Sequence, residues 1–430
     1  MTSVTDRSPD DTDAPEQPPW RDRELPLHDR VEALLSAMTL EEKVAQLGSV
    51  WIDTTGPDGG GSAAESAPLP DVFTVSTTAD VDEQLRGGVG HLTRVFGTGP
   101  ISVAEGVQRL RSWQQRVVEG NRLGIPAIAH EECLTGFATF GATAYPTPLA
   151  WAATFDVDLV REMAGAIGRD LRAVGVHQGL SPVLDVVRDY RWGRVEETLG
   201  EDPYLVGQLG AAYVRGLENA GVIATLKHFA GYAASRAARN HAPVSIGPRE
   251  LADVILPPFE TALREGGARS VMNSYTDVDG VPVAADTAFL RELLRDQWGF
   301  TGTVVSDYWS VPFLVSMHRV AEDEGAAGVV ALRAWWRCVR VSTWSCRRRV
   351  ATATSWSRTS APARWTRHWS TTRCGGCCGR SSNSGSSTAA RSSRPGHPTS
   401  TWTAPTTGGS RAPSPNARSC CWPTPTTSCR

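Results

Sequence analysis

The last hundred residues of this 430-residue chain lack acidic side chains altogether. Residues 331–430 contain no Asp or Glu, yet they hold 16 of the 43 Lys and Arg residues. The formal net charge of -3 therefore combines a strongly acidic first part with a strongly basic tail. A basic tail can bind nucleic acid, but this one has no Lys and no basic stripe at helical spacing. We therefore expect no nucleic-acid partner.

Cysteine and long apolar runs are scarce before the tail. Cys133 is the only cysteine before residue 331, and we predict that it is a small buried hydrophobe rather than a nucleophile. No window has the apolar length of a membrane span, so we expect no membrane partner. The N-terminus is rich in Asp, Pro and Thr and has no apolar core of a secretory signal. We predict a disordered lead over residues 1–25 in a cytoplasmic protein.

Between the lead and the tail, strand patterns alternate with helix patterns. Thr39 and Glu42 form a capping box within a helical pattern over residues 31–48. Strand followed by helix, repeated, indicates a parallel sheet with helices outside it. Because no Gly-rich phosphate loop follows the first strand, we favour an α/β fold of the (β/α)8 TIM-type barrel over residues 26–330, with an open sheet as the alternative. The predicted strands are 89–95, 126–130, 180–186, 222–228, 269–275 and 303–307, and the helices are 103–119, 159–174, 204–217, 248–264 and 287–297.

Polar side chains recur where five of these strands end. In a barrel of this class, the carboxyl ends of the strands carry the active site, so the recurrence predicts a polar pocket. No cluster has the spacing of metal ligands, so we expect neither a metal nor a cofactor. The residues are His130, Glu131, Glu132, Asp185, Arg188, Arg194, Lys227, His228, Asn273, Tyr275 and Asp307.

Asp307 has two interpretations that its spacing does not separate. A carboxylate fixed at a strand end can attack a sugar carbon as a nucleophile, but an Asp at this position can also cap the next helix. Tyr275 is suited to donate to Asp307 and keep its pKa low, or it is a half-buried core tyrosine. Trp309 suits stacking on a sugar face or packing in the core. His241 is expected to be only a loop residue near the pocket mouth.

The cations of the predicted pocket also have structural alternatives. Lys227 and His228 suit sugar hydroxyls, whereas the alternative is a structural ion pair. Arg194 offers a planar fork for neighbouring hydroxyls, or it forms a salt bridge to Asp185 or Glu201. Adjacent strand residues face opposite ways, so we expect Glu132 to contact substrate and Glu131 to point outward or be paired.

These residues lie in stretches that resemble glycoside hydrolase family 3, in its N-terminal barrel. The stretches cover roughly residues 30–330 and read MTLEEKVAQL, RLGIPAIAHEECLTGF, PVLDVVRDYRWGRVEETLGEDPYLVG, ATLKHFAGY, VMNSY and GTVVSDYW. The resemblance implies a retaining, exo-acting β-glycosidase that removes terminal β-D-xylose or β-D-glucose from small oligosaccharides or from aryl and alkyl β-glycosides. It implies Asp307 as the nucleophile. It also implies a sugar site of Glu132, Arg194, Lys227, His228, Met272 and Tyr275.

The chain departs from the family pattern in three ways. Glu132 replaces the shorter Asp of many relatives, which favours pentoses over glucose because the longer side chain crowds a hydroxymethyl group. Relatives that cut N-acetylglucosamine carry Asp-Ser-His after the KHF motif, and here no Asp lies two residues before His241. The acid/base Glu comes from a second domain in the family, and we find none in this sequence, so we expect impaired activity or a non-catalytic sugar-binding barrel.

Residues 331–430 have the composition of a GC-rich gene translated out of frame. They lack an apolar period and are rich in Arg, Ser, Thr, Trp, Cys and Pro. Shifting the back-translated codons by one base converts residues 341–347 into GVDVELP, and residues 373–387 and 415–430 also give family-like segments. We therefore predict a frame change between residues 331 and 340, a disordered tail, and a barrel without its last strand, open beside the Asp307 strand.

Overall fold

The computed structural model describes residues 17–51, 85, 87–97 and 99–335. All of them lie in the first of two compact units, Met1–Arg367. Most of the predicted disordered lead and nearly all of the predicted out-of-frame tail lie outside the described residues. Residues 17–25 are described and contain the 3-10 helix η1 (Pro19–Arg21), so the prediction of disorder is wrong for this part of the lead.

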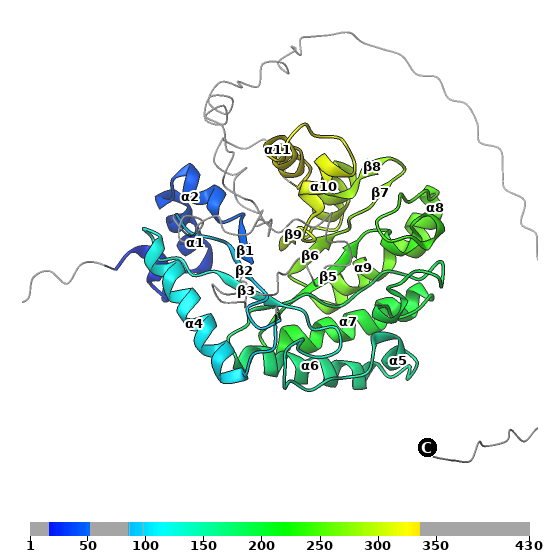
Figure 1. The fold of residues 1–430 in the computed structure, drawn as a ribbon, viewed down its shortest axis with the longest axis horizontal. Coiled ribbons are helices and arrows are strands. Elements are labelled where there is room, and N and C mark those ends of the chain that lie inside the picture. The colour runs from blue at the N-terminus through cyan, green and yellow to red at the C-terminus, as the bar shows by residue number, and fades with distance from the viewer. Residues whose placement is uncertain (1–16, 52–84, 86, 98, 336–430) are drawn as a thin grey trace, which may run out of the picture. The chain divides into compact units, whose positions relative to one another are not determined.

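Seven parallel strands form one curled sheet of the (β/α) barrel class, which confirms the predicted fold (Figure 1). Their order is β1-β2-β3-β4-β5-β6-β9, so each strand pairs with the next strand of this sheet along the sequence, and β7 and β8 lie in a separate hairpin. Among the described residues β9 pairs only with β6, which makes the strand before Asp307 an edge of the sheet. The bounds are β1 Ser49–Trp51, β2 His91–Thr93, β3 Ile128–Glu131, β4 Gln178–Gly179, β5 Ile223–Phe229, β6 Ser270–Asn273 and β9 Thr303–Val305.

Helices cover the outer face of this sheet, and Figure 1 shows α4, α6, α7 and α9 outside the strands. The predicted capping box at Thr39 is confirmed, because its hydroxyl accepts from the Glu42 N–H and the Glu42 carboxylate accepts from the Thr39 N–H. The helices are α1 Leu27–Ala37, α2 Leu40–Ala45, α4 Val103–Gly120, α5 Pro148–Ala152, α6 Val157–Ala173, α7 Pro203–Asn219, α8 Pro248–Glu250, α9 Pro257–Thr261, α10 Ser310–Ser316 and α11 Glu324–Trp335.

Several predicted elements differ from the structure. The strand predicted over residues 180–186 is wrong, because β4 contains only Gln178 and Gly179. The helix predicted over residues 248–264 is divided into α8, a π-helical turn η5 (Leu251–Ile255), α9 and a second π-helical turn η6 (Ala262–Gly266). The helix predicted over residues 287–297 is the π-helix η8 (Ala288–Gln297). Strand β1 and the hairpin of β7 (Asp277–Val278) and β8 (Val281–Pro282) were not predicted.

Close packing of α6 against α7 depends on a glycine. A Cβ atom at Gly216 would lie 2.4 Å from the Arg161 carbonyl oxygen and 2.6 Å from the Ala164 Cβ. The missing side chain lets the two backbones approach, and both helices bury an apolar stripe against the sheet. The described part of the chain contains no helix with the length and apolar character that a membrane crossing requires.

Candidate active site

Asp307 lies two residues beyond β9, at the carboxyl end of the sheet. Its side chain is buried, and Oδ1 accepts a hydrogen bond from the Tyr308 N–H at 2.9 Å. Burial raises the pKa of Asp307 to about 6, while the positive charges of Arg194 and Lys227 and a hydrogen bond from Tyr275 act in the opposite direction. The carboxyl is therefore ionised above pH 6, although it lies in a poorly solvated site.

His228 follows Lys227 in β5 and is bound by a carboxylate from the preceding strand-to-helix loop. Oδ2 of Asp185 accepts from the His228 N–H at 3.0 Å and is 2.8 Å from ring Nδ1. Burial and the charges of Arg194 and Lys227 hold the pKa of His228 well below its usual range, so the imidazole is neutral. Its other ring nitrogen, Nε2, lies 3.9 Å from Oδ2 of Asp307.

Asp185 does not lie open to the pocket. Its side chain is buried, and burial raises its pKa to about 7 against the opposing effect of the His228 N–H bond. We predicted Asp185 as a substrate-binding residue, and this assignment stays a prediction, because the structure shows only that its Oδ2 contacts His228. Both contacts involve the same oxygen, and together they orient the His228 ring.

Lys227 and Glu132 form an ion pair between β5 and the end of β3, with 2.8 Å between Nζ and Oε2. The Lys227 side chain is 3% exposed and that of Glu132 is 21% exposed, so the pair is largely shielded from solvent. Burial raises the pKa of Glu132, but the charge and hydrogen bond of Lys227 outweigh it, and the pKa lies below its usual value. The structural ion pair, which we considered as an alternative for Lys227, is present.

Glu131 is buried, and it is bound to backbone rather than to solvent. Its Oε1 accepts from the Phe96 N–H at 2.7 Å. Burial raises the pKa of Glu131 to about 8. The two adjacent glutamates therefore differ in their surroundings. Glu131 is paired inside the protein, which is one of the two positions we predicted for it, and Glu132 is the more exposed of the two.

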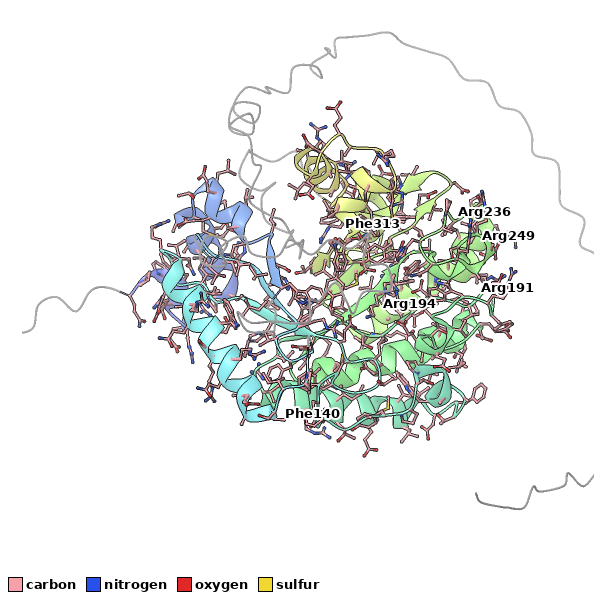
Figure 2. All side chains as sticks on the ribbon, viewed as in Figure 1. Phe140, Arg191, Arg194, Arg236, Arg249 and Phe313 are labelled. Carbon is pink, nitrogen blue, oxygen red and sulfur yellow. The ribbon has the colours of Figure 1, made fainter. Side chains whose placement is uncertain are left out.

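Arg194 donates to both oxygens of the Glu197 carboxylate, a partner that we did not predict. Its Nε and Nη2 donate to the two oxygens of Glu197, each at 2.7 Å, so the predicted partners Asp185 and Glu201 are wrong. Burial alone lowers the pKa of Arg194, but Glu197 raises it above its usual value. The guanidinium also lies 5.4 Å from the centre of the Tyr232 ring. Figure 2 shows Arg194 inside the ring of helices and Arg191 at its outer edge.

The remaining predicted residues are Met272, Tyr275 and Trp309. Met272 packs with Leu180 and Val305 in a small buried cluster. The Tyr275 hydroxyl accepts from the Trp309 N–H at 3.4 Å, and its pKa is raised by burial and by the Asp307 charge. Trp309 is half-buried. The motifs that carry Asp185, His228, Tyr275 and Asp307 therefore meet at one end of the sheet.

His241 is more than a simple loop residue, because it packs within an aromatic cluster. Its ring centre lies 4.8 Å from that of Tyr275 and 5.6 Å from that of Phe313. Burial lowers the pKa of His241 to about 4. Cys133 is fully buried, as we predicted, and burial raises its pKa to about 12. Within the described ranges, no three or more His, Cys, Asp or Glu side chains are grouped to hold a metal ion.

Two residues that act on Glu132 and Tyr308 were not predicted. Arg94 directly follows β2, and its charge lowers the pKa of Glu132. Trp51 ends β1, and its ring centre lies 4.9 Å from that of Tyr308. The Arg94 signal was available in the sequence, since a charged residue falls at the end of a predicted strand. The Trp51 signal was weak, because a three-residue strand carries almost no period.

Comparisons with known proteins identify the family of the chain. The sequence profile of the glycosyl hydrolase family 3 N-terminal domain matches residues 39–334. A β-xylosidase of Formosa agariphila is 40% identical over 241 residues, which are 53% of this chain and 33% of the relative. A periplasmic β-glucosidase of Salmonella typhimurium is 29% identical over 310 residues, covering 71% of this chain and 36% of the relative.

Solved structures give the same result. A β-glucosidase of Erythrobacter marinus superposes with a TM-score of 0.64 at 37% identity, covering 74% of this chain and 41% of that one. A β-glucosidase of Listeria innocua in complex with glucose has a TM-score of 0.60 at 31% identity, covering 71% and 41%. This chain therefore spans about a third to two fifths of the length of the relatives it matches. The family match over residues 39–334, together with the fold, shows that this chain belongs to glycosyl hydrolase family 3.

Proposed function

We propose that this chain carries the nucleophile and sugar-binding part of a retaining, exo-acting β-glycosidase for terminal β-D-xylose or β-D-glucose. The observation that carries the proposal is the environment of Asp307. A buried carboxylate lies at the end of β9, and the charges of Arg194 and Lys227 stabilise its ionised form. The names of the relatives, β-xylosidase and β-glucosidase, support the same reaction class.

In the proposed reaction, Asp307 attacks the anomeric carbon of the bound sugar. A carbon–oxygen bond forms between the carboxylate and the sugar while the bond to the leaving group breaks, which gives a glycosyl ester. Water then hydrolyses this ester and regenerates Asp307, with retention at the anomeric carbon. The Tyr275 hydroxyl and the two cations keep the attacking oxygen ionised above pH 6.

Sugar binding in this proposal uses groups that are already fixed by the protein. Lys227 and Glu132 offer donors and acceptors from one ion pair, and Nε2 of neutral His228 accepts from a hydroxyl. Because Asp185 holds the imidazole through Nδ1, the ring needs no reorganisation when sugar binds. We also propose that Glu132 gives a preference for pentoses, because it fills space that a hydroxymethyl group needs.

The general acid is not assigned to a residue of the described ranges. Retaining enzymes hold two carboxyl groups about 5–5.5 Å apart. In the described part of the chain, the other carboxylates around the pocket are engaged, Glu132 by Lys227, Asp185 by His228 and Glu197 by Arg194. We therefore propose that this chain cleaves activated aryl glycosides, whose leaving groups need little protonation, far better than alkyl glycosides.

Covalent trapping tests the proposal. The full chain is incubated with 2,4-dinitrophenyl 2-deoxy-2-fluoro-β-xyloside, and the labelled peptide is identified by mass spectrometry. We expect one adduct on Asp307 and none in the Asp307→Asn variant. An adduct on another residue, or hydrolysis that is unchanged in the variant, would contradict the assignment.

A non-catalytic sugar-binding barrel is the second candidate, and the engaged carboxylates of the pocket favour it. Calorimetry separates the two functions, since xylose binding without release of dinitrophenol or formation of an adduct supports the binding role. The N-acetylglucosaminidase alternative has less support, because His241 is buried among Tyr275 and Phe313.

A further inference from the structure

An open groove, called the Phe140 groove below, lies between the turn that follows β2 and the loop that follows β3. Its volume is about 490 Å³, which falls within the range of about 300–1,000 Å³ that is typical of ligand sites. Its described lining includes no charged side chain and no residue of the proposed sugar pocket. The aromatic and hydroxyl-bearing residues of this lining are Phe96, Phe137, Phe140, Thr135, Thr139 and Thr143.

A hydrogen bond and a ring contact fix the two walls of the Phe140 groove against each other. The Thr139 hydroxyl donates to the Phe96 carbonyl oxygen at 3.3 Å. The Phe96 ring lies edge-on to the Phe137 ring, with 5.4 Å between their centres. Buried Glu131 holds the first wall in place, because its carboxylate accepts from the Phe96 N–H at 2.7 Å. The groove is therefore preformed, and a ligand that enters it does not have to order its walls.

The exposed apolar surface of this groove is the ring of Phe140. Phe140 is 68% exposed, whereas Phe96 and Phe137 of the same groove are buried. Thr135 and Thr143 are also exposed, and each hydroxyl can both donate and accept a hydrogen bond. A pyranose ring has an apolar C–H face and a rim of hydroxyl groups, so it matches an aromatic ring beside hydroxyls. Because the described lining carries no charge, a neutral sugar fits the groove better than an ionic ligand.

The end of β3 connects the Phe140 groove with the proposed sugar pocket. The carboxylate of Glu132 pairs with Lys227, whereas the backbone carbonyl of Glu132 accepts at 2.9 Å from the N–H of Ala138, which lines the groove. Figure 2 shows Phe140 well apart from Arg194 of that pocket. A sugar chain in the groove is therefore held beside the pocket without occupying it.

We propose that the Phe140 groove is a second saccharide-binding site, which holds a neutral β-linked xylo- or gluco-oligosaccharide. The choice of these two sugars rests on the proposed function, whereas the match between a neutral sugar and the lining does not depend on it. A second site raises the effective concentration of the oligosaccharide at the pocket near Asp307. A chain that engages both sites therefore binds more tightly than a single sugar does.

Titration calorimetry on the full chain tests the inference after the pocket is closed by the 2-deoxy-2-fluoroxylosyl adduct on Asp307. Xylotetraose and cellotetraose are the two probes, and the one that binds identifies the backbone sugar. We expect the labelled protein to bind at least one of them. Phe140→Ala should weaken this binding by ~10-fold or more, because an aromatic anchor is lost. Phe140→Tyr should bind within about twofold of wild type, since it keeps the ring.

Phe155→Ala is the matched control, because Phe155 is 71% exposed and does not line the groove. It should leave the dissociation constant unchanged. Neither alanine variant should change kcat/KM on 2,4-dinitrophenyl β-xyloside, which occupies only the pocket. Equal binding by wild type and Phe140→Ala would overturn the inference. A loss of activity on this xyloside in Phe140→Ala would do the same, since the groove would then belong to the pocket.

The proposed function and this inference fail in different ways. If Asp307 is labelled but the labelled protein binds neither tetrasaccharide, only the inference falls. If no adduct forms, the proposed function falls, and the same titration is made on the unlabelled wild type and Phe140→Ala. Weaker binding by the variant then supports the groove as a saccharide site, and equal or absent binding overturns it.

Discussion

Oδ2 of Asp185 accepts a hydrogen bond from the His228 N–H at 3.0 Å and lies 2.8 Å from the Nδ1 atom of the same residue. Both side chains are buried, and His228 Nε2 lies 3.9 Å from Asp307. Asp185 therefore fixes the imidazole against the residue that we propose as nucleophile. In this way the loop after β4 determines the geometry at the ends of β5 and β9.

Asp185→Asn should lower kcat/KM on 2,4-dinitrophenyl β-xyloside by roughly 10–100-fold, because the amide no longer defines the tautomer and orientation of His228. The fold should be retained, since Asn has nearly the same shape and avoids a buried charge. Asp189→Asn is the control, because Asp189 pairs with Arg191 at the surface. Activity within twofold of wild type in Asp185→Asn would show that the positioning role is unnecessary.

Lys227→Met should abolish sugar binding and destabilise the protein by roughly 3 kcal/mol, because it leaves the carboxylate of Glu132 without its cation. The double variant Lys227→Met/Glu132→Gln should recover most of that stability, since no unpaired charge remains, but it should not recover binding. Chemical denaturation and calorimetry give the two readouts. Additive losses of stability in the double variant would mean that the ion pair is not coupled.

The pH dependence of turnover should follow the carboxyl of Asp307. Its pKa is raised to about 6, chiefly by burial, so the attacking carboxylate becomes protonated as the pH falls through 6. We expect kcat/KM on the activated xyloside to fall about tenfold for each pH unit below that value. A profile that stays flat down to pH 4.5 would indicate another nucleophile.

The protonation state of Asp307 should also affect the stability of the fold, but in the opposite direction. The protonated form stabilises the folded protein, whereas turnover needs the ionised form. The pKa of Asp307 is about 6 in the folded protein and 3.8 ordinarily, so the folded state binds the proton more tightly. Its contribution to stability is fully present below pH 3.8 and is lost as the pH rises through 6. Asp307→Asn should therefore stabilise the protein at pH 7 by on the order of 1–3 kcal/mol. Thermal denaturation at pH 4 and pH 7 provides the comparison, and an equal effect at both pH values would contradict this reasoning.

Gly216→Ala should destabilise the chain by roughly 2–3 kcal/mol, because its new methyl group would lie 2.4 Å from the Arg161 carbonyl oxygen and force α6 from α7. Gly247→Ala is the matched control, since a Cβ there meets no atom within 4 Å. Urea denaturation of both variants measures the difference. Equal stability of the two variants would mean that the helices adjust without cost.

The sequence predicted the helices whose apolar residues repeat at regular spacing. It missed the elements that lack such a repeat. The long helices α4, α6 and α7 lie within a few residues of their predicted bounds, because their apolar stripes repeat over several turns. The strand that we predicted over residues 180–186 starts after the observed strand β4. Gln178 of β4 is polar, and its side chain is held by hydrogen bonds to Thr225 and Ser270, which lie far away in the sequence. The π-helical turns have no local signal, because tertiary packing selects them.

Residue order alone determined the fold class, and it indicated the residues that we propose for the chemistry. Lys227 and His228 lie near the end of the buried strand β5, Asp307 follows β9, and these positions bring them to one end of a parallel sheet. Only the tertiary structure decided how they are paired. In the structure Asp185 pairs with His228, Glu197 pairs with Arg194, and Glu132 pairs with Lys227. Such pairings depend on distances between side chains far apart in the chain, and a local sequence pattern does not specify those distances.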